Sequence, residues 1–351
     1  MILKINDRIR TRTVKFFSDF DLTLRYDAVA SGFGFKMYFD PDNLEHKEML
    51  CIGHDHIATL EHEGQLLLTG YIMSQGFNDS KETELVGISG YSFPGILEDC
   101  QIPVELYPLQ YDGLTLREIS QKLLSYFRIT MVVDPSVSAE MDKAYEKTTA
   151  EPTQTIKEYL ASLAGQRNIV ITHNEKGHLV YTKAKTNRKP ILDYNGEIPF
   201  TNMALDFGGQ DMHSTITVIK QADSKGGNAG EATVTNPFVP FVRRPRVATQ
   251  SSGDDNDTLE VAKNILADEL RGLKLTITSD RWDVNGVIVK PNNLITVKNP
   301  RIYLYKKATW FIEQVDYKGD EKNQTLTMTC CLPEVYSAAE PTYLFKGINM
   351  H

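Results

Sequence analysis

The stretch LLLTGYIMSQGFNDSKETELVGISG, residues 66–90, decides the fold class of the amino-terminal part of the chain. Its two ends, residues 66–72 and 84–90, are apolar runs typical of strands, and Asn78-Asp79-Ser80-Lys81 lies between them as a turn. Similar alternating runs occur upstream, at residues 21–26 and 34–39. Many short strands separated by turns favour a barrel or a sandwich. We therefore expect residues 1–105 to be an all-β domain.

The pattern changes in residues 106–194. Thr115-Leu116-Arg117-Glu118 is a capping box, in which the threonine hydroxyl and the glutamate carboxylate each satisfy an amide of the first helical turn. The apolar residues that follow recur at helical spacing as far as Phe127. A second box at Thr155-Ile156-Lys157-Glu158 predicts a shorter helix that ends at Gly165. Two strands are expected next, at residues 168–172 and 178–182, so this segment is predicted to be a small α+β module.

The remainder of the chain returns to strand patterns, with one long interruption. Between Asp223 and Asp257 the sequence is rich in Gly, Ser, Asn, Pro and Asp, and it has no periodicity, which predicts a long loop that is mobile or is ordered by a partner. Asp257 then caps a helix that ends at Gly272. We expect residues 243–282 to be an inserted loop and helix region, and residues 338–351 to be a C-terminal tail.

Composition narrows the functional classes. The chain has 351 residues, and 38 basic against 46 acidic side chains give a net charge of -8, which argues against tight binding of nucleic acid. There is no apolar run long enough for a membrane span, and residues 1–6 include a lysine where a signal peptide requires an apolar core, so we expect no membrane anchor. The four cysteines lack metal-binding spacing and are predicted to be reduced core thiols.

One cluster of histidines raises a metal site as an alternative. On a strand, residues two apart share a face, so His54 and His56 could both point at a metal, and the chain would then be a secreted metal-dependent hydrolase. The sequence favours exposed turns here instead, because Gly53 and residues 61–64 look like turns and no second ligand group has a recognisable spacing. The sequence places no nucleophile, base and orienting group together. We therefore predict no catalytic, metal or cofactor-binding residues, and no enzymatic activity.

Two further segments are candidates for contacts with other subunits. Arg243, Arg244 and Arg246 form the one dense cluster of basic residues, called the basic knot below. Such a cluster indicates surface charge, an inter-subunit salt link or a weak contact with passing DNA. Tyr343, Leu344 and Phe345 form an apolar knot in a polar tail after Pro341. We expect these three side chains to be exposed and to dock on a partner.

Several segments in the same order resemble the phage Mu-like tail baseplate hub family. LLTGYI at residues 67–72, VGISGYS at 86–92 and ILEDC at 96–100 are similar to the "tGyI" strand, "GRS" strand and "LxDC" turn of that family. The two capping-box helices and the hairpin at 177–180 continue the series, as do FIEQV at 311–315 and LPEVY at 332–336. The likeness covers about residues 60–337. Tyr91 departs from it, because the family often has arginine at that position.

The resemblance implies a mainly β fold with α+β insertions: two similar β-barrel domains plus two smaller inserted domains. The first barrel would be residues 1–105, and the second would be residues 195–242 together with 283–337. It further implies a homotrimeric hub without cofactors that joins a sixfold tail tube protein to a threefold spike protein and to other baseplate proteins. DNA would pass through its channel without specific binding. Such a protein is assembled in the bacterial cytoplasm and resides in the virion; a hub of a type VI-like or extracellular injection system is the alternative.

Overall fold

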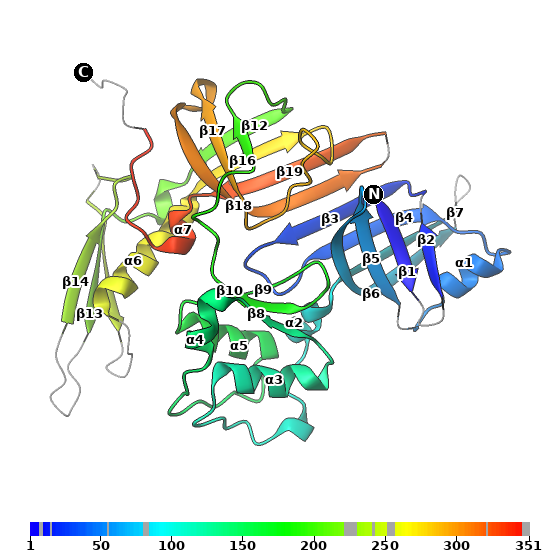
Figure 1. The fold of residues 1–351 in the computed structure, drawn as a ribbon, viewed down its shortest axis with the longest axis horizontal. Coiled ribbons are helices and arrows are strands. Elements are labelled where there is room, and N and C mark those ends of the chain that lie inside the picture. The colour runs from blue at the N-terminus through cyan, green and yellow to red at the C-terminus, as the bar shows by residue number, and fades with distance from the viewer. Residues whose placement is uncertain are drawn as a thin grey trace. The chain divides into compact units, whose positions relative to one another are not determined.

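The computed structural model describes residues 1–6, 10–14, 16–54, 56–79, 84–220, 230–240, 243–250, 257–320 and 322–345 (Figure 1). Strands account for 43 % and helices for 22 % of the structure, which confirms the mainly β class. The chain forms two compact units, and each is built from three separate segments of the sequence. The first contains residues 1–183, 280–282 and 314–326, and the second contains residues 184–279, 283–313 and 327–351.

The first unit contains an antiparallel sheet. Its strands are β1 (Ile2–Asn6), β2 (Thr11–Val14), β3 (Asp19–Arg25), β4 (Gly32–Tyr38), β5 (Ile57–His62), β6 (Gln65–Asp79), β7 (Glu84–Ser92) and part of β18 (Leu304–Gly319). Helix α1 (Leu44–Met49) connects β4 to β5. The strand order is β2-β1-β5-β6-β7-β4-β3-β18, and residues 314–319 of β18 pair with β3. Along β3 and β4 every second side chain is buried, as the alternating sequence predicts.

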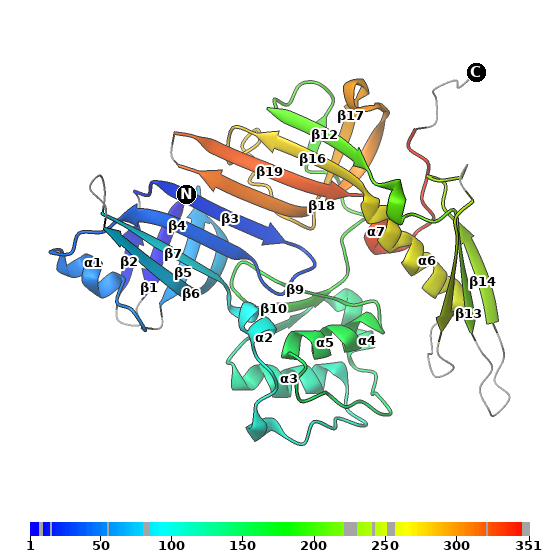
Figure 2. The ribbon, with the colours of Figure 1, turned by 180° about the vertical axis from the view of Figure 1, so that it is seen from behind.

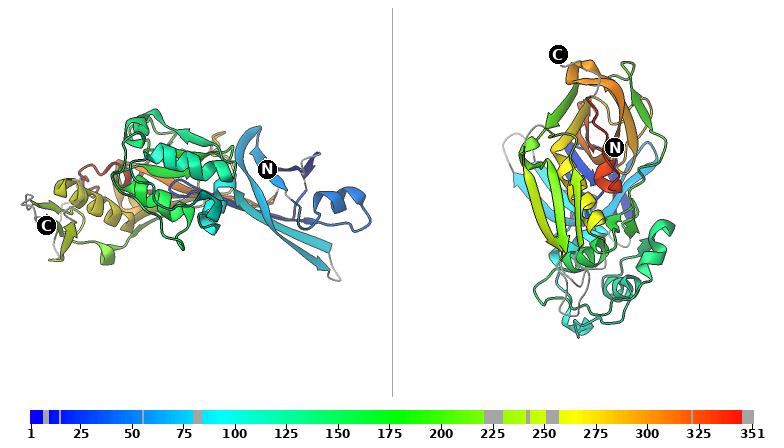
Figure 3. Two further views of the ribbon diagram at one scale, coloured as in Figure 1. Left: turned by 90° about the horizontal axis from the view of Figure 1, so that it is seen from below. Right: turned by 90° about the vertical axis from the view of Figure 1, so that its left-hand side faces the viewer.

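The hairpin of β6 and β7 confirms the two strands predicted from residues 66–90 (Figure 3, left, light blue). Two glycines allow these strands to approach each other closely. A Cβ atom at Gly70 would lie 1.9 Å from the carbonyl oxygen of Tyr91, and one at Gly90 would lie 1.9 Å from that of Tyr71. Both positions therefore exclude any side chain while the hairpin keeps this geometry.

An aromatic cluster fills the core beneath this sheet. Trp282 is 1 % exposed, although it lies far along the sequence from the strands that it packs against. Its ring centroid is 5.6 Å from that of Phe20 and 6.4 Å from that of Phe17, and its Nε1 donates a hydrogen bond of 2.9 Å to the carbonyl of Lys318. Phe35 packs edge-on against Phe17 in the same cluster. The buried core of the first unit thus depends on a residue from the second half of the chain.

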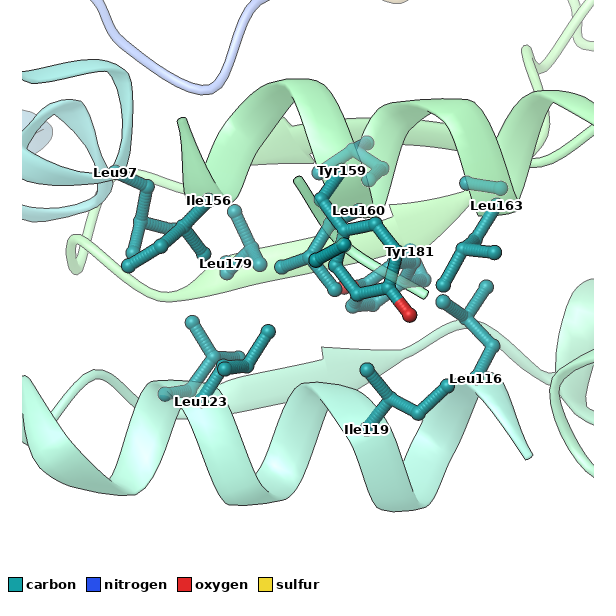
Figure 4. Close-up of a cluster of buried hydrophobic side chains, with 14 of the residues drawn as sticks. Leu97, Leu116, Ile119, Leu123, Ile156, Tyr159, Leu160, Leu163, Leu179 and Tyr181 are labelled. Atoms are coloured by element: carbon teal, nitrogen blue, oxygen red, sulfur yellow. The ribbon is translucent and has the colours of Figure 1, made fainter. Parts of the chain in front are cut away.

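The α+β module of the first unit has its own core. Its elements are α2 (Ile96–Asp99), α3 (Leu116–Tyr126), β8 (Met131–Val133), α4 (Ser138–Met141), α5 (Ile156–Gly165), β9 (Val170–His173) and β10 (Leu179–Thr182). Both predicted capping boxes are present, at Thr115 with Glu118 and at Thr155 with Glu158. The apolar faces of the two longer helices meet over the strands, as Figure 4 shows for Leu116, Ile119, Leu123, Ile156, Tyr159, Leu160, Leu163, Leu179 and Tyr181. These elements form a packed α+β structure, and the boundaries 106–194 of the predicted module stay a prediction.

The second unit contains a further group of mainly antiparallel strands. Its strands are β11 (Leu192–Tyr194), β12 (Asn202–Phe207), β16 (Leu273–Ser279), β17 (Leu294–Asn299), the first part of β18 and the last part of β19 (Gln324–Cys331). The order is β12-β16-β19-β18-β17-β11, and only the pair of β11 with β17 is parallel. Figure 2 shows β12, β16, β19 and β18 as successive strands. The short helix α7 (Glu334–Ser337) follows β19.

A separate three-stranded sheet corrects the prediction of an irregular loop. Strands β14 (Gly230–Thr235) and β15 (Pro245–Gln250) lie within the segment 223–257 and pair with β13 (Thr215–Lys220), one antiparallel and the other parallel. Helix α6 (Thr258–Glu269) packs on β13 and β14 (Figure 3, right), and its buried residues include Ala262 and Leu266. Composition concealed these strands, because turn-forming residues flank them on both sides. Residues 236–240 and 243–244 of the predicted loop lie outside helices and strands, and residues 223–229, 241–242 and 251–256 lie outside the described residues.

The two predicted barrels are not confirmed. No closed barrel is formed among the described strands, because β2 ends the strand order in the first unit, and β12 and β11 end it in the second. The strands are also divided differently: β13 and β14, from the range of the second barrel, join the separate small sheet, whereas β16, from the predicted inserted region, joins the larger sheet. The two barrels with their boundaries therefore stay a prediction.

Candidate functional site

The basic knot lies in the second unit, where two of its three arginines bind within the chain. Arg244 donates from Nη1 to the carbonyl of Gly209 at 2.7 Å and from Nη2 to that of Gln210. Arg246 donates from Nη1 to Oε1 of Glu269 at 2.9 Å. Arg243 is exposed. These contacts do not involve the side chain of Arg243. Contact with another subunit stays a prediction for all three arginines.

Glu269 is the buried partner that organises this region. Its side chain is 4 % exposed at the last residue of α6, and besides Arg246 it binds His213 twice. The backbone amide of His213 donates to Oε2 at 2.8 Å, and Nδ1 of the same residue lies 2.8 Å from Oε1. A buried carboxylate is stable only when its oxygens are satisfied in this way. The arginine knot therefore has a structural role in joining α6 to the start of β13 and to β15.

Replacing Glu269 with alanine is expected to destabilise the second unit by about 1–3 kcal/mol. The change leaves the His213 amide without its acceptor, whereas water screens part of the loss at Arg246, whose side chain is 44 % exposed. Denaturant unfolding followed by circular dichroism measures the change. The neighbouring Asp268→Ala is the matched control, because that carboxylate is 80 % exposed and should cost less than about 0.5 kcal/mol. Equal losses in the two variants would contradict the structural role of Glu269.

The C-terminal aromatic residues are half-buried and not exposed, which corrects the sequence prediction. The rings of Tyr343 and Phe345 lie with their centroids 5.7 and 6.2 Å from that of Phe238, which is 6 % exposed. Phe345 also contacts Tyr303, at a centroid distance of 5.8 Å. Leu344, which lies between Tyr343 and Phe345 in the sequence, is also half-buried. The tail up to Phe345 thus packs on its own unit, and its docking on a partner stays a prediction.

Sequence reasoning missed the aromatic residues beside this tail. Tyr303 and Tyr305 are each 51 % exposed, and their ring centroids lie 5.6 Å apart. Leu304 between them is 1 % exposed. The sequence Tyr-Leu-Tyr carried only part of the signal, because Tyr305 lies in β18 whereas Tyr303 precedes that strand with a left-handed backbone (φ 70°). With Phe238, Tyr343 and Phe345 these two tyrosines form one aromatic cluster.

The histidines of the alternative metal site do not share a strand face. His54 is exposed in a bend, whereas His56 is 1 % exposed and places Nε2 at 3.0 Å from the carbonyl oxygen of Cys51. Their rings are stacked with centroids 6.2 Å apart, and β5 begins only at Ile57. The geometric premise of the alternative, two ligands on one strand face, is therefore wrong. All four cysteines are free; Cys330 and Cys331 are buried as predicted, whereas Cys51 and Cys100 are half-buried.

Comparison with known proteins gives matches over part and over nearly all of the chain. Residues 94–183, the α+β module, match the family model of the second domain of gp44-like baseplate hub proteins. The baseplate hub protein gp44 of Escherichia phage Mu is 25 % identical over 274 residues, which are 73 % of this chain and 69 % of that protein. The predicted resemblance to the Mu-like hub family is therefore confirmed.

Solved structures of tail proteins share the fold. The 43 kDa tail protein of prophage MuSo2 from Shewanella oneidensis superposes with a TM-score of 0.78 at 17 % identity, and the match covers 96 % of this chain and 99 % of that one. The tail protein from Neisseria meningitidis MC58 gives 0.74 at 20 % identity, with 97 % and 98 % covered. A chain of the Francisella PdpA-VgrG complex gives 0.62 at 10 % identity, with 97 % and 59 % covered.

Proposed function

We propose that this chain, a relative of the Mu-like baseplate hub proteins, is itself the structural baseplate hub of a contractile phage or prophage tail. The sequence match to the Mu hub protein over 274 residues carries the proposal. The match of residues 94–183, the α+β module, to the second domain of gp44-like hubs also supports it. No helix of the described residues has the length and apolar character needed to cross a membrane.

In this proposal three chains form a closed ring. Each chain contains two units that each hold a group of mainly antiparallel strands, so three chains supply six such units around one axis. A ring of this kind meets a sixfold tail tube on one side and a threefold spike on the other, because its repeated elements satisfy both symmetries. The function is then to match symmetry, and it requires no catalytic group.

The charge of the chain supports a channel for DNA at the centre of the ring. A net charge of -8 disfavours the phosphate contacts that would retain DNA during its passage. The hub would be assembled in the bacterial cytoplasm with the tube, the spike and other baseplate proteins, and it would remain in the tail baseplate of the virion. Arg243 and the tail residues Tyr343, Leu344 and Phe345 are the candidates for contacts with those partners.

A hub of a type VI-like or extracellular injection system is the second candidate. The fold likeness to a chain of the Francisella PdpA-VgrG complex favours it, although that likeness covers 59 % of the other chain. The two candidates share the trimeric ring and differ in the particle that contains it. Electron microscopy of particles from the source cells, labelled with antibody against this chain, would distinguish a virion tail from an injection device without a capsid.

The purified protein is expected to have the mass of a trimer. Light scattering should give about 119 kDa, three times the chain mass of 39.7 kDa, because the proposed ring closes only with three subunits. Dilution from about 50 to 1 μM should leave the mass unchanged if the interfaces have the area of permanent complexes. A mass of one chain at all these concentrations would contradict the ring.

A further inference from the structure

The β9–β10 hairpin of the module lies against the first sheet. The turn of this hairpin approaches so closely that a Cβ atom at Gly177 would lie 2.6 Å from the ring of Phe93 and 2.9 Å from the carbonyl oxygen of Thr69. From the other side, Val29 in the turn between β3 and β4 is 2 % exposed and belongs to the apolar core of the module. The module and the sheet are thus packed along this contact.

One hydrogen bond joins side chains across the contact. Nε2 of His173, the last residue of β9, lies 2.6 Å from Oγ of Ser31, which follows the β3–β4 turn and is 1 % exposed. Ser31 is itself fixed by the sheet. Its backbone amide donates to Oγ of Ser92 at 3.1 Å, and its hydroxyl oxygen accepts a hydrogen bond of 3.1 Å from the amide of Arg25.

The partners of the two side chains determine where the protons lie. Nδ1 of His173 is 3.2 Å from the carbonyl oxygen of Asn174, which can only accept, so Nδ1 carries a proton. In the neutral imidazole with its proton on Nδ1, Nε2 is an acceptor, and the Ser31 hydroxyl donates to it while its oxygen accepts from the Arg25 amide. If Nε2 were protonated as well, it would donate to the second lone pair of the Ser31 oxygen, and the hydroxyl proton would lose Nε2 as its acceptor. Every donor in the contact is satisfied only when the imidazole is neutral.

We propose that the His173–Ser31 pair is a protonation-sensitive latch that holds the α+β module on the first sheet and weakens when the imidazole gains a second proton. A proton on Nε2 would face the Ser31 hydroxyl proton, and the hydroxyl would have to turn away from its partner. Because Ser31 is buried, its proton would lose a hydrogen bond that water cannot replace. Acidification would therefore loosen the hairpin from the sheet without any change in the packing of either one alone.

The charged groups around the imidazole of His173 do not reverse this effect of protonation. Burial is the main influence on His173, and it lowers the pKa of the imidazole below the usual 6.5, against smaller opposing effects of the Asn174 carbonyl and of Glu175. The hairpin also contains Lys176 and His178, and the β3–β4 turn contains Asp27. The folded protein thus binds fewer protons than the unfolded chain. Stability is complete above about pH 6.5 and falls as the pH drops below that value.

The test compares the pH dependence of the full-length protein with that of a variant that cannot be protonated at this site. In His173→Gln the amide oxygen can accept from Ser31 at every pH. Between pH 7.5 and 5.5 the melting temperature of the wild type should fall by about 2–4 °C more than that of H173Q. Hydrogen exchange in the peptides of the β9–β10 hairpin, corrected for the intrinsic effect of pH, should become about tenfold faster in the wild type alone.

Two further variants keep the proposal falsifiable. Ser31→Ala should lower the melting temperature at pH 7.5, and its difference from the wild type should shrink at pH 5.5, where the bond to His173 is already weakened. His54→Gln, which removes an exposed histidine of the same unit, should retain the full pH dependence of the wild type. Parallel pH profiles for the wild type, H173Q and S31A would overturn the latch.

Discussion

Replacing Trp282 with alanine is expected to lower the free energy of unfolding of the first unit by about 3–5 kcal/mol. The indole is 1 % exposed and packs against Phe17, Phe20 and His62, so its removal leaves a large cavity among rigid rings. The carbonyl of Lys318 also loses its hydrogen bond from Nε1. Urea unfolding measured by far-ultraviolet circular dichroism is suitable, because the variant keeps only one of the two tryptophans for fluorescence.

Two control variants separate the causes of this loss. Trp282→Phe keeps an aromatic ring but not the hydrogen bond, and it should cost about half as much as alanine. Phe16→Ala removes an aromatic side chain of the same unit that is 82 % exposed, so its effect should be within about 0.5 kcal/mol. If W282A were as stable as F16A, Trp282 would not be part of the core of the first unit.

Replacing Gly90 with valine is expected to prevent the β6–β7 hairpin from forming with its present register, at a cost of more than about 3 kcal/mol. A Cβ atom there would lie 1.9 Å from the carbonyl oxygen of Tyr71 and 2.9 Å from Cζ of Phe33. The first of these neighbours is backbone, so the strands themselves would have to separate. The yield of soluble protein and its melting temperature should both fall.

The same hairpin provides the matched control for this change. Gly76 is also a residue of β6, but a Cβ atom there would have no neighbour within 4 Å. Gly76→Ala should therefore be neutral or should stabilise the hairpin by about 0.5 kcal/mol, because glycine in a strand loses more conformational entropy than alanine. Equal effects of G90V and G76A would show that close approach of the strands is not the reason for Gly90.

Features determined by neighbouring residues could be predicted from the sequence. Each capping box lies within four residues, and α3 was expected to extend to about Phe127 and ends at Tyr126. The strands β6 and β7 follow from two apolar runs on either side of turn residues, although β6 continues to Asp79, beyond the predicted end at Ile72. In the same way, burial of Leu116, Ile119 and Leu123 follows from helical spacing alone.

Features that depend on distant residues could not be predicted in this way. No local pattern indicates that Trp282 packs against Phe20, or that Ser31 forms a hydrogen bond with His173, which lies 142 residues further along the chain. The pair of Arg246 with Glu269 likewise converts an apparently free basic residue into part of a buried contact. Such contacts arise from the order of strands in the sheets, which the alternation of single strands does not contain.

The interleaved sequence of the two units has a consequence for biosynthesis. The first unit includes residues 280–282 and 314–326, and β3 pairs with residues 314–319. When a ribosome has translated only the first half of the message, Trp282 and the last strand segments of that unit have therefore not yet been synthesised. The module at residues 94–183 is contiguous, and it can collapse as soon as it leaves the exit tunnel, whereas the amino-terminal sheet has to wait for the polypeptide to be almost finished.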